Sequence, residues 1–182
     1  MKLMKFRYLL IASLLISNLS FAISDDAFTD GKSALLTHQQ CKDLTARKGA
    51  IAVPTSVPKG FQLGKMELLF EKDSDAVDYT LVYVGPSGKT FIIHGSNDGL
   101  GDVMINDEGV LKGKNPYLKG EIYINNFEDS QDLASQWIQG ISEVQPKGAK
   151  TPLSYSLSAP AKSELSKEET LKIMSSLRFL KK

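Results

Sequence analysis

The sequence has few cysteine and histidine residues, and each shortage argues against a class of function. Cys41 is the only cysteine among 182 residues, so no internal disulfide can form and stability must come from a packed core. We predict that Cys41 is a small buried apolar side chain; the alternative is an exposed thiol that pairs with another chain. With only two histidines, a Ser-His-Asp arrangement would need His38 or His94 as its base, and the chain has no G-x-S-x-G motif.

Long apolar runs are also absent, apart from one at the start of the chain. Three basic residues precede an apolar run at 8–19, which is followed by the small-residue motif SFA at 20–22. This is the layout of a signal peptide, because an apolar run of about 12 residues is shorter than the roughly 20 that span a membrane. We therefore predict a signal peptide over residues 1–22, cleavage after Ala22, and export to the periplasm or beyond the cell. The alternative is an uncleaved membrane anchor.

The chain has almost no net charge. Its 22 basic and 21 acidic residues give +1, and loss of the three basic residues of the signal peptide changes this to −2. Nucleic acids and anionic lipids both require a basic surface, so the charge argues against either partner. The length after cleavage suits one core, and we predict a helical segment over 23–50 and a single α+β domain over 51–182.

Turn residues separate several runs with β-strand character. Prolines 54 and 58 favour an extended approach over 51–58 rather than the interior of a regular element. Helical spacing of small and apolar residues, with Gly49 as a stop, predicts a helix over 33–48. Alternating and β-branched residues predict strands over 63–71, 78–84, 89–94, 121–127 and 153–158.

The last segment has the clearest local pattern. Ser166 and Glu169 form a capping box, in which each side chain satisfies a free amide at the start of a helix. Leu171, Met174 and Leu177 follow on one face, so we predict an amphipathic helix that runs through Leu177 and packs on the sheet. The basic residues Arg178, Lys181 and Lys182 fall at the negative end of its dipole.

The stretch GPSGKT at 85–90 resembles a phosphate-binding loop only superficially. The motif G-x-x-x-x-G-K-[ST] would need its first glycine at position 83, which is Tyr83. The residues that follow, FIIH, have a strand pattern, so no helix N-terminus points at the loop. We predict a turn between two antiparallel strands.

Metal and cofactor sites are not indicated. His38, Cys41 and His94 could supply three zinc ligands, but they lack the paired spacing of zinc sites, and a partly buried helix explains the first two. The acidic stretch 95–109 does not fit the ligand spacing of an EF-hand, so we predict a surface loop there. We predict no cofactor, no metal and no catalytic residue.

Two separated motifs resemble a family of uncharacterised bacterial extracytoplasmic domains, often found in lipoproteins or behind anti-sigma factors. The motifs are VPTSVPKGF at 53–61 and LSKEETLKIMSSL at 165–177, and Trp137 and the YSL segment at 155–157 are similar to the family's late strands. The resemblance implies a curved antiparallel sheet with a helix across it and no catalytic residue. It favours a strand around Trp137, although the spacing of Leu133, Trp137 and Ile141 also fits a helix. The chain lacks the lipobox cysteine and has a longer connection at 141–152.

These observations favour a non-enzymatic exported domain that binds an apolar ligand or an envelope protein on its sheet face. Two alternatives remain: a small extracytoplasmic hydrolase with dispersed carboxylates, and a purely structural interaction protein. Trp137 is either a core anchor or part of a ligand-facing surface. Four aromatic residues form the candidate ligand or partner surface: Trp137, Tyr79, Tyr83 and Tyr155.

Overall fold

A computed structural model describes most of the chain after the predicted signal peptide. The described residues are 25–46, 51–69, 78–96, 111–118, 121–126, 133–139, 154–160 and 165–181. The predicted signal peptide, most of the acidic stretch 95–109 and the connection 141–152 lie outside them.

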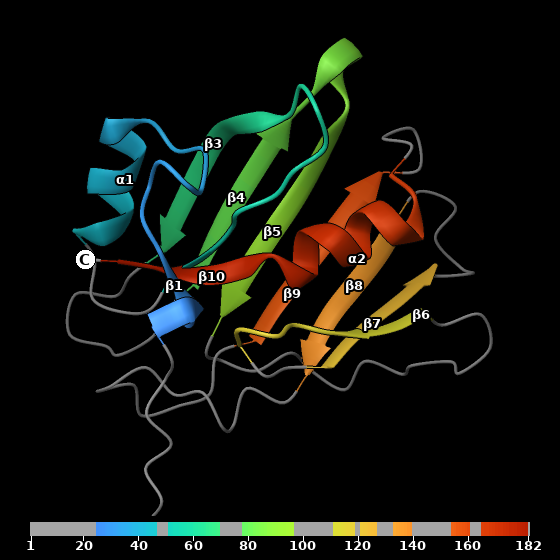
Figure 1. Cartoon of the computed structure of the whole chain (residues 1–182). Coiled ribbons are helices and arrows are strands. Elements are labelled where there is room, and N and C mark those ends of the chain that lie inside the picture. The colour runs from blue at the N-terminus through green and yellow to red at the C-terminus, as the bar shows by residue number, and fades with distance from the viewer. Residues whose placement is uncertain are drawn as a thin grey trace, which may run out of the picture.

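The described chain forms a large antiparallel sheet and a smaller sheet that lies across it (Figure 1). The large sheet contains, from one edge to the other, β3 (Gln62–Leu69), β4 (Asp78–Val84), β5 (Thr90–Ser96), β9 (Ser154–Pro160), β8 (Leu133–Gln139), β7 (Glu121–Asn126) and β6 (Leu111–Lys114). Every neighbouring pair in it is antiparallel. Two helices accompany these curved, unclosed sheets, which confirms the predicted α+β class.

The smaller sheet joins segments from both ends of the described chain. Its central strand is β10 (Leu177–Leu180), which pairs in parallel with β1 (Phe28–Thr29) and antiparallel with β2 (Ala52–Pro54). The sequence predicted one sheet and two helices, but not this second, smaller sheet. The helices are α1 (His38–Thr45) and α2 (Lys167–Ser175), and the short 3-10 turns are η1 (Asp25–Ala27) and η2 (Pro86–Gly88).

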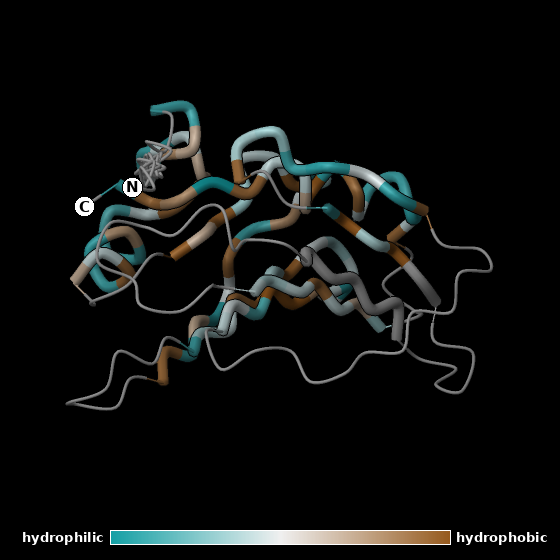
Figure 2. Tube along the Cα trace, turned by 90° about the horizontal axis from the view of Figure 1, so that it is seen from below, coloured by the Kyte–Doolittle hydropathy of each residue, from teal (hydrophilic) through white to brown (hydrophobic). Residues whose placement is uncertain are grey.

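The smaller sheet and α2 form a layer that packs against one face of the large sheet (Figure 2), whereas α1 lies beside the sheet edge at β3. In β4 and β9, alternate residues are buried, because every second side chain of a strand points to the same face. The most buried large side chains of the core come from both layers: Tyr79, Tyr83, Tyr155, Phe91, Phe179, Leu44, Leu81, Ile93, Leu118, Ile122 and Ile124.

We call the covered face of the large sheet the inner face, and the smaller sheet with α2 the covering layer. Two close approaches hold the covering layer on the inner face. A side chain at Gly113 of β6 would meet Leu171 of α2, with a Cβ only 2.3 Å from its nearest methyl group, so glycine lets α2 lie on the sheet. On β5, Gly95 leaves room for the ring of Tyr79, which would lie 2.4 Å from a Cβ there. The hydroxyl of Tyr79 reaches the backbone of Ala52 in β2, so this ring spans the two layers.

The prediction that the last helix includes Leu177 is wrong. The capping box of Ser166 and Glu169 is present, but α2 ends at Ser175. The side-chain amide of Asn115 donates to the carbonyl oxygens of Met174 and Leu177, at 2.9 and 3.1 Å, and so satisfies acceptors where the helix stops. From Leu177 onward the backbone bonds to the smaller sheet instead, and this burial outweighs the helical periodicity.

The predicted turn at 85–90 is confirmed. Antiparallel β4 and β5 are joined through η2, in which Ser87 and Gly88 have φ angles of 58° and 74°. The segment around Trp137 is strand β8, as the family resemblance favoured. No helix in the described residues is long and apolar enough to cross a membrane.

The first helix begins later than predicted. Thr37 caps α1 and pairs with Gln40 in a second capping box, so the helix covers only part of the predicted range 33–48. The preceding residues form one turn that ends at Leu35, whose φ is 58°. The bonds from Leu36 N to Gly31 O and from Leu35 N to Lys32 O match a Schellman motif, which normally places glycine at this position.

Candidate functional site

The candidate site is the face of the large sheet that lies opposite α2, which we call the open face. No helix or strand among the described residues packs on it, because the contacts of both helices and of β2 are made with the inner face or with the edge at β3. The side chains that β4, β5 and β9 place on it are half-buried, apart from the buried Ser96 and the exposed Val84. That is the exposure of side chains that stand next to one another on an uncovered sheet.

Strand register brings seven residues into one line across this face, which we call the central row. Directly paired residues on neighbouring strands share a face, so the register alone places them together. From β3 to β6, the central row consists of Glu67, Thr80, His94, Ser156, Trp137, Tyr123 and Lys112.

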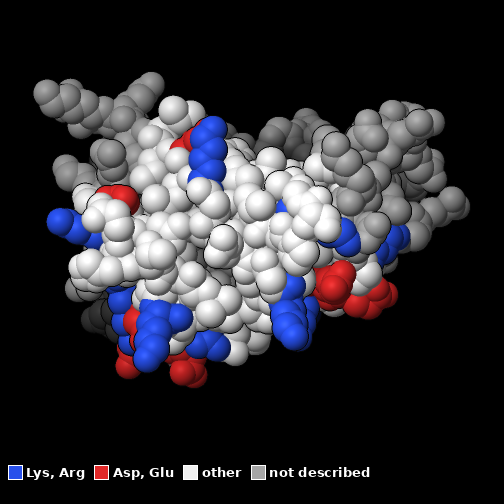
Figure 3. Space-filling view, turned by 90° about the horizontal axis from the view of Figure 1, so that it is seen from above, with Lys and Arg blue, Asp and Glu red and all other residues white. Residues whose placement is uncertain are grey.

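The centre of the open face is rich in hydroxyl groups and poor in charge. Strand β9 places Ser154, Ser156 and Ser158 on it, and the neighbouring β5 adds Ile92. Figure 3 views the molecule from the end of the sheet that bears the β4–β5 turn. In this end-on view, Lys and Arg lie together with Asp and Glu along the lower rim, which is the side of the helices.

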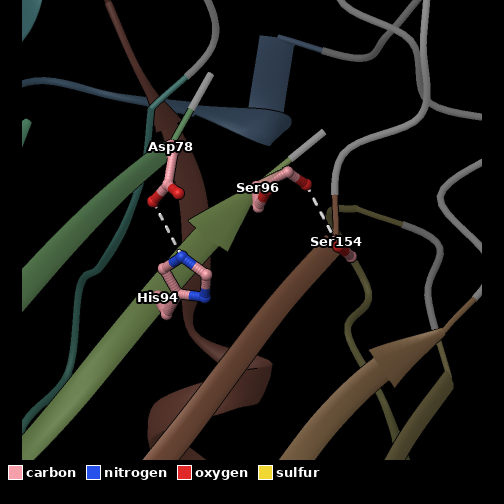
Figure 4. Close-up of polar contacts among 4 residues, drawn as sticks. All are labelled: Asp78, His94, Ser96 and Ser154. Carbon is pink, nitrogen blue, oxygen red and sulfur yellow. Dashed lines mark hydrogen bonds and ion pairs between the residues drawn. The ribbon is translucent and has the colours of Figure 1, made fainter. Parts of the chain in front are cut away.

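His94 of the central row forms an ionisable pair with Asp78. Nε2 of His94 is 2.8 Å from Oδ1 of Asp78, and their side chains are 36% and 34% exposed. The two residues come from adjacent strands and lie diagonally across the ladder (Figure 4). In the same view, the hydroxyl of Ser154 donates to the carbonyl oxygen of Ser96 at 3.0 Å. The second ring nitrogen of His94 points away from Asp78.

Three of the four predicted surface aromatics are not at the surface. Tyr79, Tyr83 and Tyr155 are 0%, 1% and 0% exposed. Their positions on β4 and β9 face the inner layer, so they form the core beneath the smaller sheet and α2. The sequence showed that Tyr79 and Tyr83 share one face of a strand, but not that this face is the covered one.

The buried tyrosines differ in their hydrogen bonds. The Tyr79 hydroxyl donates to the carbonyl oxygen of Ala52 and accepts from its N–H group, both at 2.9 Å. The hydroxyls of Tyr83 and Tyr155 have no hydrogen-bond partner in the described structure. Burial raises the pKa of all three phenols above the ordinary value, because the charged phenolate would lose its hydration. They are therefore neutral core groups at physiological pH.

Trp137 is at the centre of the open face by register, paired with Ser156 on one side and Tyr123 on the other. It is the predicted surface residue that the backbone places in the central row. Thr80, Ser156 and Tyr123 were not predicted from the sequence to share one surface. The predicted turn at 85–90 could have placed Thr80 beside His94, because a hairpin turn sets the register of its two strands, here β4 and β5. The same register brings Asp78 close to His94.

The residues considered for a metal site are dispersed. His38 is exposed at the start of α1, Cys41 is half-buried against Gly31, and His94 is on the open face. Among the described residues, no three His, Cys, Asp or Glu side chains are grouped so that they could hold a metal ion.

Comparison with known proteins adds no relative. No protein-family model, curated protein or solved structure matches this chain. The function must therefore be argued from the open face itself.

Proposed function

We propose that this protein is an exported, non-enzymatic binding domain that docks an envelope protein on its open face. The observation that carries the proposal is the central row, in which hydroxyl, imidazole and aromatic residues are aligned on a face that no described element covers. Aromatic residues are enriched at protein interfaces, and serine and threonine hydroxyls adapt to the polar groups of a partner.

A protein partner suits this face better than an apolar small molecule. Small apolar ligands bind in concave sites that enclose most of their surface. Here the inner side of the sheet is filled by its own tyrosines and aliphatic residues, and the open face displays a serine on every second position of β9. A broad, polar and nearly neutral face is suited to another folded protein.

Export and family membership belong to the same proposal. The basic start, short apolar run and SFA motif support a signal peptide that ends at Ala22. The motifs at 53–61 and 165–177 support membership of the extracytoplasmic family that they resemble. A domain of this kind acts by binding its partner in the envelope, and the fold alone does not identify that partner.

Site-specific photo-crosslinking in the producing cells tests the proposal. A photoreactive phenylalanine analogue is placed at Thr80 or Ser158 on the open face, and at the exposed Lys42 of α1 as the matched control. We expect one crosslinked protein from both positions on the open face and none from position 42.

A second pair of variants shows whether the crosslink reports binding. Ser156→Arg places a long charged side chain at the middle of the central row and should remove the crosslink, whereas Lys42→Glu should leave it unchanged. Equal crosslinking from position 42, or a crosslink that survives Ser156→Arg, would contradict the proposal.

Hydrolysis is the second candidate function, and the Asp78–His94 pair is the observation that favours it. Ser156 is directly paired with His94, so carboxylate, imidazole and hydroxyl groups come from three adjacent strands. It ranks second because the pair is about one-third exposed rather than enclosed. If the site hydrolyses esters, Ser156→Ala and His94→Gln should each lower the rate at least about 100-fold, and the neighbouring Ser158→Ala should not. Equal rates in all three variants would exclude it.

A further inference from the structure

The two edges of the large sheet are built differently. β6 has four residues and places Lys112 and Lys114 at its edge, which is a common protection against pairing with another chain. β3 has eight residues and is the other edge strand. It ends in Leu69, which is 68% exposed. A long edge strand with an exposed leucine is a place where a further strand can add to the sheet.

Among the described residues, no strand pairs with the outer edge of β3, and only the second half of this edge is left uncovered by α1. The side-chain amide of Gln40 in α1 donates to the carbonyl oxygen of Leu63 at 2.9 Å, so the helix occupies the beginning of this edge. The register with β4 is interrupted between Leu63 and Lys65, where Gly64 forms an irregularity. The side chains of Lys65 and Glu67 beyond it are 67% and 53% exposed.

We propose that two copies of this chain pair through β3, antiparallel, with the two-fold axis at Met66. In this register Lys65 of one copy lies opposite Glu67 of the other, and the same pair recurs on the other side of the axis. The two charges already form an ion pair within each chain, so the dimer places four alternating charges together.

Charge selects this register over its neighbours. Moving the axis to Glu67 places two glutamates opposite each other, and moving it to Lys65 does the same with two lysines. A register shifted by a single residue would place core-facing residues of one copy opposite solvent-facing residues of the other, because successive residues of a strand point to opposite faces. In this dimer the open faces of both copies point to the same side of the joined sheet, so they form one continuous surface.

Analytical ultracentrifugation with charge reversal tests the proposal. We expect the purified chain to dimerise, and Lys65→Glu or Glu67→Lys to weaken dimerisation about tenfold or more, because each reversal creates two like-charged pairs. The double variant Lys65→Glu/Glu67→Lys restores opposite charges and should restore the dimer. Both side chains are exposed, so circular dichroism should show the same fold in every variant.

Crosslinking at the axis supplies an independent readout. In a Cys41→Ser background, Met66→Cys should form a disulfide-linked dimer on mild oxidation, because the axis brings the two cysteines together. Lys42→Cys in the same background is the control and should remain monomeric. A monomer at about 100 μM, at which edge pairing of micromolar affinity would be nearly complete, overturns the proposal. Failure of the double reversal to restore dimerisation does so as well.

Discussion

Replacing each buried tyrosine by phenylalanine separates two kinds of buried hydroxyl. The Tyr79 hydroxyl satisfies both the N–H and the C=O group of Ala52, which is itself fully buried. Tyr79→Phe removes both bonds and leaves two backbone groups without a partner, which costs about 2–4 kcal/mol of unfolding free energy. In a domain of this size such a loss lowers the melting temperature by roughly 5–10 °C.

Tyr83→Phe and Tyr155→Phe should behave differently, because neither hydroxyl has a partner in the described structure. Removing an unsatisfied buried hydroxyl leaves stability unchanged or raises it by up to about 1 kcal/mol. Tyr123→Phe on the half-exposed open face is the matched control and should change stability by less than about 0.5 kcal/mol.

Urea denaturation of the four variants, followed by circular dichroism, measures these differences. The decisive quantity is the difference in unfolding free energy between Tyr79→Phe and the other two core variants, which we expect to be at least about 2 kcal/mol. If all three core variants lose the same stability, the hydroxyls of Tyr83 and Tyr155 have partners such as buried water. The described packing of the core would then be wrong.

Four further predictions concern stability and processing. Above pH 10 the tyrosines of the unfolded chain ionise, whereas the three buried phenols of the folded core stay neutral because burial raises their pKa values. The free energy of unfolding should therefore be at its full value below pH 10 and should fall above it by about 4 kcal/mol per pH unit for the three groups together. Urea titrations at pH 9, 10 and 11 check this, and Tyr155→Phe should reduce the slope by about one third. Asn115→Ala should cost about 3 kcal/mol in urea denaturation, since its side chain serves two carbonyl groups and the N–H groups of two neighbouring residues; a loss below 1 kcal/mol would contradict this. Leu35→Gly should raise stability by about 1 kcal/mol in thermal unfolding, because Leu35 is 57% exposed and has a positive φ angle; a decrease would contradict the strain. Amino-terminal sequencing of the exported protein should begin at Ile23, and a chain that still starts at Met1 would refute the cleavage.

The sequence predicted elements well where local pattern and burial agree. Strand β9 alternates serine with apolar residues, and the structure places its serines on the open face and its apolar residues in the core. The capping box likewise predicted where α2 begins. The same kind of box at Thr37 and Gln40 was present in the sequence and would have placed the start of α1 correctly.

Elements that depend on distant contacts could not be predicted in this way. Leu177 continues the apolar periodicity of α2, but Asn115, remote in sequence, bonds to the carbonyl groups where the helix ends. β2 and β6 are too short to show a pattern of their own. For the site, the alternation of β4 placed its tyrosines on one face, and only the covering layer decided that this face is internal.

The position of β10 between β1 and β2 has a consequence for how the chain matures. Residues 177–180 form the central strand of the smaller sheet. Until they are available for folding, the chain lacks the strand that pairs with both β1 and β2. The layer over the tyrosines therefore closes only after α2 and β10 have emerged. On our proposal that the chain is exported, this order would postpone final folding until translocation is nearly complete.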